Sequence, residues 1–279
     1  MPNTQTTLQR KPQSGGLNAN FLKIFAALTM LIDHAAISIV YTKLRHVSDF
    51  ASAWELVHSA EATQEQLASI SAEFMSLFTI LQTMRLIGRI AFPVFCFLIY
   101  EGFCHTKSIK RYLLRLLICA VCAELPFNLI CSGYFGESAT LLYPDMQNTI
   151  WTLLISLLML CGLKHLEAKD VTIRSSMLQM TGQFLLTILA CLAAVFFRTD
   201  YSYLGPLLIA VFYFCRRNRR LQVILGCILF LPVNIAHLFA FLPIALYNGE
   251  RIPSKKFNLF FYLFYPAHLL ILYLITLAL

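Results

Sequence analysis

The chain consists of long apolar segments separated by short polar connections. The apolar segments cover residues 21–41, 86–103, 112–131, 149–163, 177–197, 201–215, 221–247 and 257–279. Most approach the roughly 20 residues that a helix needs to cross a bilayer, at a rise of about 1.5 Å per residue. They lack the alternation of apolar and polar residues that a transmembrane β-barrel requires. The pattern therefore predicts an all-α fold, a polytopic bundle of transmembrane helices.

The segment 221–247 decides the predicted number of spans. It is too long for one typical span, and Pro232 and Pro243 interrupt it. If it forms a hairpin, the chain crosses the membrane about nine times, within a range of eight to ten, and most Lys and Arg residues adjoin the cytoplasm. A single span would move the basic residues of 251–256 outside and weaken that asymmetry. We therefore predict nine spans and a cytoplasmic N-terminus.

The remaining segments predict a tail, one membrane domain and one large loop. Residues 1–20 are polar and predict a disordered cytoplasmic tail, and 21–279 predict a single domain. In the nine-span topology the loop 42–84 is extracytoplasmic. Its second half carries apolar residues at helical spacing: Leu67, Ile70, Phe74, Leu77 and Leu81. This spacing predicts a helix that lies on the membrane surface or caps the domain.

Composition supports a membrane protein. The chain is 58% hydrophobic and 13% charged, with a mean hydropathy of +0.69, which leaves too few polar residues to cover a soluble domain. The net charge of +8 follows from basic residues beside the apolar segments, so it indicates membrane orientation rather than nucleic-acid binding. The nine cysteines show no metal-ligand spacing. The one CxxC, Cys119 to Cys122, lies in an apolar helix and favours packing. We therefore expect the lipid bilayer as a partner, no nucleic acid and no metal.

Ionisable side chains inside the apolar segments are the functional candidates, because each costs about 2.5–3.5 kcal/mol at a helix centre. They are Lys23, Asp33, His34, Arg89, Glu101, Arg115, Glu124, His237 and His268. Lys23 and Arg115 lie near cytoplasmic ends, where long side chains extend to water. A structural role is also favoured for His237, one turn after Asn234.

Two further pairs are candidates: a structural role is favoured for the first, and the second is open between structure and function. Glu101 lies four residues before His105, a spacing at which the two side chains can pair on one helix face. Glu124 and Asn128 likewise share a helix face, around a kink at Pro126. We include these four residues, with Tyr265, as candidate substrate or cavity residues.

Asp33, His34, Arg89 and His268 are predicted to converge. His34 lies about 20 Å from the cytoplasmic start of its span, and His268 about 16 Å into the last span. Arg89 begins a span that runs inward from the outer face. Neighbouring helix residues point about 100° apart, so Asp33 is expected to pair with Arg89 or another donor while His34 faces a cavity. Such a set suits a histidine base or a proton-coupled transporter, and the residues alone leave both open.

Several sequence blocks occur in the order of a known family. They are "LKIFAALTMLIDH" (22–34), "RLIGRIAFPVFCFLIYEGFCHTKSIKRYLLRLL" (85–117), "ELPFNL" (124–129), "NTIWTLLISLL" (148–158), "DYSYLGPLLI" (200–209) and "FFYLFYPAHLLILYLI" (260–275). They resemble the TraX family, whose namesake acetylates the N-terminus of conjugative pilin. The resemblance extends from about residue 20 to the C-terminus. The loop 42–84 looks expanded relative to the family.

The resemblance implies an enzyme. TraX proteins are distantly similar to the acyltransferase-3 and heparan-α-glucosaminide N-acetyltransferase group. This similarity implies transfer of an acetyl group from cytoplasmic acetyl-CoA to an amine or hydroxyl at the outer side of a bacterial inner (cytoplasmic) membrane. The acceptor would be a pilin-like N-terminus or a cell-surface glycan. His34 holds the place of that group's catalytic histidine, and "YPAH" makes His268 the second candidate.

The implied mechanism assigns roles to the remaining candidates. The phosphates of acetyl-CoA, the one co-substrate, would be held by basic residues near the cytoplasmic face: Lys107, Lys110, Arg111 and Arg115. His34 would deprotonate the acceptor, and Asp33 and Arg89 would fix the local charge. His268 would donate to the thioester oxygen or protonate the departing thiolate. A secondary transporter is the alternative, but the two matching halves expected of one are not evident in the sequence.

Overall fold

The computed structural model describes residues 15–135, 140–143, 145–167, 173–251 and 254–279. In these residues the backbone forms helices and turns, with two isolated bridges as the only β-type pairing. The α-helices are α1 (Ala19–Ala35), α2 (Tyr41–Arg45), α3 (Phe50–His58), α4 (Gln64–Ala68), α5 (Ala72–Gly88), α6 (Ala91–His105), α7 (Ile109–Phe135), α8 (Thr149–His165), α9 (Ile173–Phe196), α10 (Leu204–Phe214), α11 (Arg219–Phe230), α12 (Phe241–Ala245) and α13 (Lys255–Thr276). A π-helical turn, Ala36–Val40, joins α1 to α2, and a 3-10 helix, Ile235–Ala240, precedes α12.

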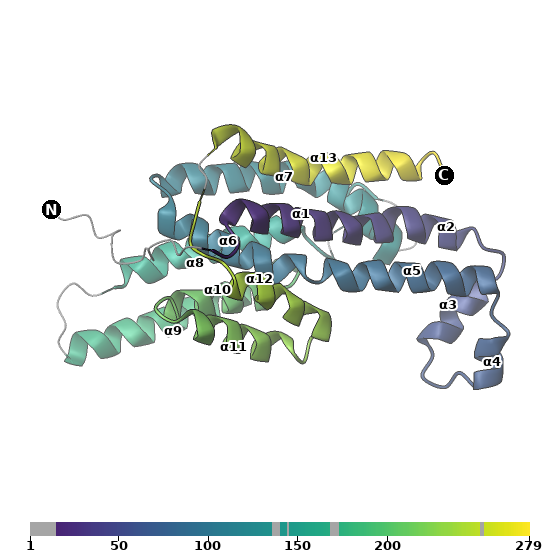
Figure 1. The fold of residues 1–279 in the computed structure, drawn as a ribbon, viewed down its shortest axis with the longest axis horizontal. Helices are drawn as coiled ribbons and strands as arrows, with labels where there is room; N and C mark the ends of the chain where they lie inside the picture. Colours follow the sequence, from purple (N-terminus) through teal and green to yellow (C-terminus); the bar gives the residue numbers. More distant parts are fainter. Residues whose placement is uncertain (1–14, 136–139, 144, 168–172, 252–253) are drawn as a thin grey trace.

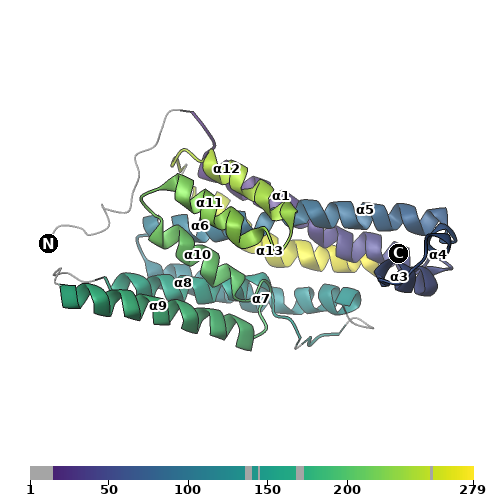
Figure 2. The same ribbon diagram turned by 90° about the horizontal axis from the view of Figure 1, so that it is seen from below.

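The long helices run side by side along the molecule. α13 lies on α7, and α1 lies between α13 and the α5–α6 pair (Figure 1). α8, α9 and α10 pack together on the other side of α6 and α7, and α11 with α12 closes that side (Figure 2). The largest cluster of buried apolar side chains lies where these two groups of helices meet.

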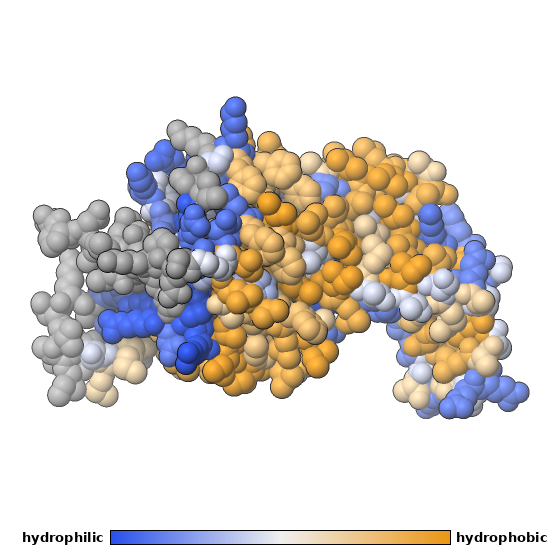
Figure 3. Space-filling view, in the orientation of Figure 1, coloured by the Kyte–Doolittle hydropathy of each residue, from blue (hydrophilic) through white to orange (hydrophobic). Residues whose placement is uncertain are grey.

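The helical membrane bundle is confirmed. Five helical stretches are long and apolar enough to cross a bilayer: Ala19–Arg45, Ala72–His105, Ile109–Tyr134, Ser176–Phe196 and Lys256–Thr276. Three shorter apolar helices accompany them: Thr149–His165, Leu204–Phe214 and Ile235–Ala245. On the surface, a broad hydrophobic belt separates hydrophilic ends (Figure 3). The chain is therefore a multi-pass membrane protein.

The segment 221–247 forms the predicted hairpin. α11 and the 3-10 helix with α12 pack against each other, and a turn at 231–234 joins them. Each arm is short. The 12 residues of α11 rise about 18 Å, less than the hydrocarbon thickness of about 30 Å. The hairpin therefore replaces two predicted spans with two partial ones.

The extent of the predicted loop 42–84 differs from the prediction. Residues 72–88 form α5, which packs along α1 and α2 and continues, after a break at Arg89, into α6. Phe74 and Leu81 are fully buried in a second apolar cluster with Leu44. The apolar residues that predicted a surface helix therefore pack between helices. The segment that connects α2 to α5 shortens to about residues 46–71.

The predicted tail also ends earlier than residue 20. Residues 1–14 lie outside the described part of the chain. Leu17 pairs with the backbone on either side of Tyr247, donating to Leu246 O and accepting from Asn248 N, both at 2.9 Å. Asn18 caps α1 by accepting a hydrogen bond from Phe21 N. Residues 17–20 are therefore fixed to the connection between α12 and α13.

A small cap, residues 46–71, lies at the end of the bundle away from the N-terminus (Figure 1). Its rings of Phe50 and Trp54 pack tilted against each other, and both meet Tyr41 of α2 edge to face. Asp49 ties the cap to the start of α5, since its two carboxylate oxygens accept 2.9 Å hydrogen bonds from the backbone N and the hydroxyl of Ser71. These bonds lower the pKa of Asp49 from its ordinary value of 3.8.

We expect the cap to loosen in acid. Because the pKa of Asp49 is lower in the folded cap, its contribution to stability is complete above about pH 4. That contribution is lost as the pH falls through the lowered folded value. Hydrogen exchange of residues 46–75 measures this, with Asp49→Asn compared at each pH so that intrinsic exchange rates cancel. The two proteins should differ at pH 6, and the difference should shrink as the pH falls below about 4. A constant difference would contradict the role of this carboxylate.

Candidate active site

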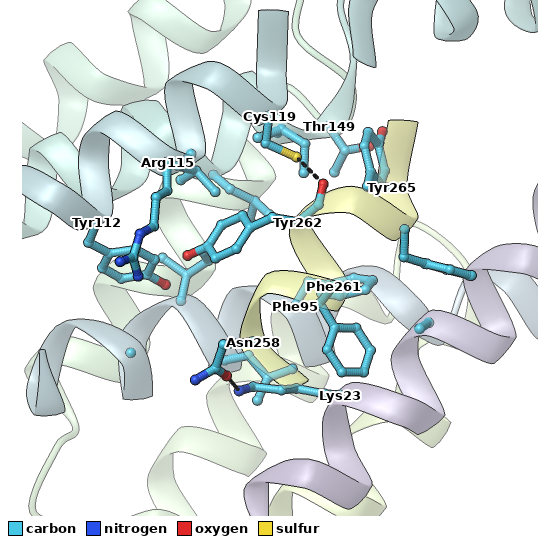
Figure 4. Close-up of a pocket in the computed structure, with 18 of the residues that line it drawn as sticks. Lys23, Phe95, Tyr112, Arg115, Cys119, Thr149, Asn258, Phe261, Tyr262 and Tyr265 are labelled. Carbon is cyan, nitrogen blue, oxygen red and sulfur yellow. Dashed lines mark hydrogen bonds between the residues drawn. The ribbon is translucent and has the colours of Figure 1, made fainter. Parts of the chain in front are cut away.

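A cavity of about 730 Å³ lies between α1, α6, α7 and α13. Its size falls within the roughly 300–1,000 Å³ typical of small-molecule sites. The loop before α10 and the first turn of α8 complete its wall. Lys23 and Asn258 hydrogen-bond at 2.5 Å on one side of it, and Thr149 and Tyr265 lie together farther along (Figure 4). The cavity therefore extends along the helices rather than across them.

The two parts of the cavity differ in chemistry. One part carries five basic side chains: Lys23, Lys107, Arg111, Arg115 and Arg251. The other part carries Asp33, His34 and Asp200. Lys23 and His34 stand eleven residues apart on α1, about 16 Å by helical rise. A long anionic molecule can thus hold its charges among the basic residues while its far end reaches the histidine.

His34 and His268 are in direct contact. His34 Nδ1 and His268 Nε2 are 2.8 Å apart, and both side chains are buried. α1 and α13 bring them together from 234 positions apart in sequence. The predicted convergence of the two histidines is thus observed, as a hydrogen-bonded pair.

The hydrogen bonds of His268 determine where the protons lie. His268 Nδ1 lies 2.8 Å from the backbone oxygen of Phe264, which can only accept, so Nδ1 carries a hydrogen. In the neutral ring Nε2 is then bare and accepts from Nδ1–H of His34. A neutral His34 protonated at Nδ1 is bare at Nε2. The pair therefore holds His34, which lines the cavity, in the tautomer of a proton acceptor.

A π-helical turn begins two residues after His34. Residues Ala36–Val40 are π-helical, and Ser38 Oγ donates to the backbone oxygen of His34 at 2.6 Å. π-helical turns within α-helices are rare, and those that occur are often found at functional sites. No sequence pattern that we used predicts this one.

Asp33 pairs with Arg85, a donor from another helix as the alternative expectation allowed, and not with Arg89. Arg85 Nη1 donates to Asp33 Oδ2 at 2.6 Å, and both side chains are largely buried. Gly88, the last residue of α5, permits the approach, because a Cβ there would lie 2.2 Å from Asp33 Cβ. Arg89 lies against the Tyr201 hydroxyl instead and does not line the cavity.

Asp200 and Tyr201 line the cavity and were missed as site residues. They stand at the boundary of the apolar segment 201–215, where an aspartate can reach water and a tyrosine carries no burial cost that would single it out. Thr149 Oγ1 donates to Asp200 Oδ2 at 2.6 Å. Tyr201 stacks on Phe92 with ring centroids 3.7 Å apart. Arg251, Lys23 and Thr149 are also cavity residues that had no assigned site role.

The basic residues predicted to hold phosphates divide into two groups. Lys107, Arg111 and Arg115 line the cavity, whereas Lys110 does not. Lys110 and Arg111 are adjacent on α7, so they point about 100° apart. Sequence position alone therefore could not separate Arg111, which lines the cavity, from Lys110, which does not.

Three predicted cavity residues lie elsewhere. Glu101 accepts from Tyr247 at 3.2 Å and lies 3.8 Å from Arg219. Glu124 accepts from Trp151 at 2.8 Å and also from Asn148, which joins α7 to α8. Asn128 donates to the backbone of Leu141. These side chains bond to neighbouring helices or connections and do not line the cavity.

The other two predicted cavity residues, His105 and Tyr265, do line it. His105 lies near the basic part, with its Nδ1 3.6 Å from the Glu101 carboxylate. Tyr265 is buried one turn before His268. Among the described residues no group of three or more His, Cys, Asp or Glu is arranged to hold a metal ion.

Comparison with known proteins identifies relatives of this chain. The family model described as "TraX protein" matches residues 18–276. A curated protein of Dichelobacter nodosus, "Probable fimbrial assembly protein FimC, serogroup H1", is 25% identical over 210 residues, which cover 68% of this chain and 82% of that protein. No solved structure matches the chain.

Proposed function

Because this chain belongs to the TraX family, we propose that it is a membrane-embedded acetyltransferase that takes an acetyl group from cytoplasmic acetyl-CoA. The proposed acceptor is an amine or hydroxyl at the outer side of the bacterial inner membrane, on a pilin-like N-terminus or a cell-surface glycan. The name of the Dichelobacter nodosus relative favours a pilus or fimbrial protein over a glycan.

One observation carries this proposal. The His34–His268 pair leaves Nε2 of His34 without a hydrogen. His34 lines a cavity whose other part carries five basic side chains. A histidine that accepts a proton from an attacking amine or hydroxyl accelerates such transfers by about 10²–10⁴-fold. The likeness to the acyltransferase-3 group is not among the matches and remains a prediction.

The proposed reaction needs no covalent enzyme intermediate. The acceptor nitrogen or oxygen attacks the thioester carbon, and its proton moves to His34 Nε2. The resulting imidazolium donates through Nδ1 to His268, which the Phe264 backbone oxygen holds in place. The C–S bond then breaks, and the thiolate takes up the proton from His34. In this scheme His268 positions the base, which replaces its predicted role as a donor to the thioester.

The direct test is transfer of labelled acetyl from acetyl-CoA by the purified chain in liposomes, with a pilin-type peptide and a glycan as acceptors. Labelled product supports the proposal. A wild-type protein that transfers nothing to either acceptor, and that acetyl-CoA does not stabilise against heat, refutes it. Proton flux driven by a substrate gradient in the same liposomes would instead favour the transporter.

The basic part of the cavity yields a matched pair of variants. Arg111→Gln removes a cavity cation, so we expect the KM for acetyl-CoA to rise roughly tenfold, the equivalent of about 1.4 kcal/mol. Lys110→Gln removes the same charge one residue earlier, outside the cavity, and should leave KM within about twofold. Steady-state kinetics at two salt concentrations separates contact from general attraction. Equal effects of the two variants would contradict a phosphate site at Arg111.

A further inference from the structure

The connection between α9 and α10 has an unusual backbone. Arg198, Tyr201 and Ser202 have φ of 50°, 60° and 45°, the left-handed region that residues other than glycine rarely adopt. Such conformations persist only where the surroundings enforce them, and they cluster at functional sites. Two of the residues in this connection, Asp200 and Tyr201, line the cavity that holds His34.

Contacts with Gln147, just before α8, and with Phe92 of α6 hold this connection in place. Asp200 N donates to the backbone oxygen of Gln147, and Gln147 N donates to that of Arg198, both at 2.9 Å. The ring of Tyr201 lies flat on that of Phe92, with an interplanar angle of 6°. The phenol is thus fixed in position before any ligand binds.

The hydroxyl of Tyr201 has a free hydrogen. The guanidinium of Arg89 lies against its oxygen, and a guanidinium only donates. The O–H hydrogen of Tyr201 is therefore available to an acceptor. The positive charge behind the oxygen polarises the O–H bond, which strengthens it as a donor.

The proposed reaction needs such a donor, and His268 does not supply it. When the acceptor attacks the thioester, negative charge develops on the carbonyl oxygen. Both ring nitrogens of His268 are occupied, by His34 and by the backbone of Phe264. Tyr201 lines the same cavity as His34 and carries a hydrogen.

We propose that Tyr201 is the oxyanion donor of the acetyl transfer, with Arg89 as the residue that positions and polarises it. This inference rests on the proposed function. As the C–N or C–O bond forms and the acceptor proton passes to His34, the carbonyl electron pair moves to oxygen and is held by Tyr201 O–H. When the C–S bond breaks, the carbonyl reforms and Tyr201 keeps its proton.

The test compares two tyrosines of the same connection. Tyr201→Phe removes only the hydroxyl and keeps the ring on Phe92, so we expect kcat to fall about 10²–10³-fold with KM for acetyl-CoA nearly unchanged. Tyr203→Phe makes the same change two residues later, on a half-exposed ring outside the cavity, and should retain wild-type kcat. Stabilisation by acetyl-CoA in a thermal shift reports folding of each variant.

Arg89 provides an independent readout. Arg89→Lys keeps a cation that donates to the Tyr201 oxygen and should retain more activity than Arg89→Met. This difference should vanish in the Tyr201→Phe background, because Arg89 acts through that hydroxyl. An Arg89 effect that persists unchanged in the Tyr201→Phe background would overturn the inference. If Tyr201→Phe does not fold, equal activities of Arg89→Lys and Arg89→Met would overturn it.

The remaining outcomes are distinguishable. Wild-type kcat in Tyr201→Phe, or a rise in KM alone, overturns the oxyanion donor and leaves the acetyltransferase intact. Absence of transfer by the wild-type protein overturns both. A kcat defect confined to Tyr201→Phe, with normal stabilisation by acetyl-CoA, supports the inference.

Discussion

The His34→Gln variant is expected to lose acetyl transfer, with kcat reduced about 10²–10⁴-fold. Glutamine can still donate a hydrogen bond to His268, but it has no nitrogen that takes up a proton. Binding of acetyl-CoA should survive, because Lys23 and the other basic residues proposed to hold its phosphates belong to a part of the cavity about 16 Å away along α1. Transfer of labelled acetyl measures the first effect, and thermal stabilisation by acetyl-CoA measures the second.

Variants of His268 separate positioning from catalysis. His268→Gln retains an oxygen that can accept from His34 Nδ1, whereas His268→Leu cannot orient the base. We expect the glutamine variant to be about tenfold or more the faster of the two, because the partner fixes the tautomer of the base. The exposed His58→Gln serves as the control and should leave kcat unchanged. Equal rates for the two His268 variants would contradict the positioning role.

The sequence was informative where burial has a clear cost. Apolar segment length predicted the bundle, and helical rise alone placed His34 and His268 at similar depth although 234 positions separate them. The orientation of Asp33 away from His34 followed from the 100° between neighbouring residues. These properties depend on regular helix geometry, so they can be read from residue numbers.

The errors arose where geometry departs from a regular helix. Arg85 and Arg89 are one turn apart, and depth could not decide which of them meets Asp33 across the break between α5 and α6. Tyr201 has a left-handed backbone, which a sequence normally indicates only by a glycine, so it could not be predicted. Burial cost singled out Glu101 and Glu124, but it cannot distinguish a charge that serves a ligand from one that a neighbouring helix satisfies.

Loss of either partner of the Asp33–Arg85 pair should destabilise the protein by about 3–5 kcal/mol, because the other charge stays buried without its partner. Asp33→Asn and Arg85→Met are the single variants, and asparagine keeps the size that the approach of Gly88 requires. The double variant removes both charges and should recover most of the loss. Unfolding in mixed SDS and mild detergent measures the three free energies.

A second ion pair of the same length provides the control. Arg198 Nη1 and Asp145 Oδ1 also lie 2.6 Å apart, but their side chains are 61% and 65% exposed, against 12% and 18% for Arg85 and Asp33. Exposed pairs contribute about 0–1 kcal/mol, so the corresponding variants Asp145→Asn and Arg198→Met should change stability little. If both cycles gave the same coupling energy, burial would not be the cause. Asp33 and Arg85 would then be held by packing at Gly88 rather than by their charges.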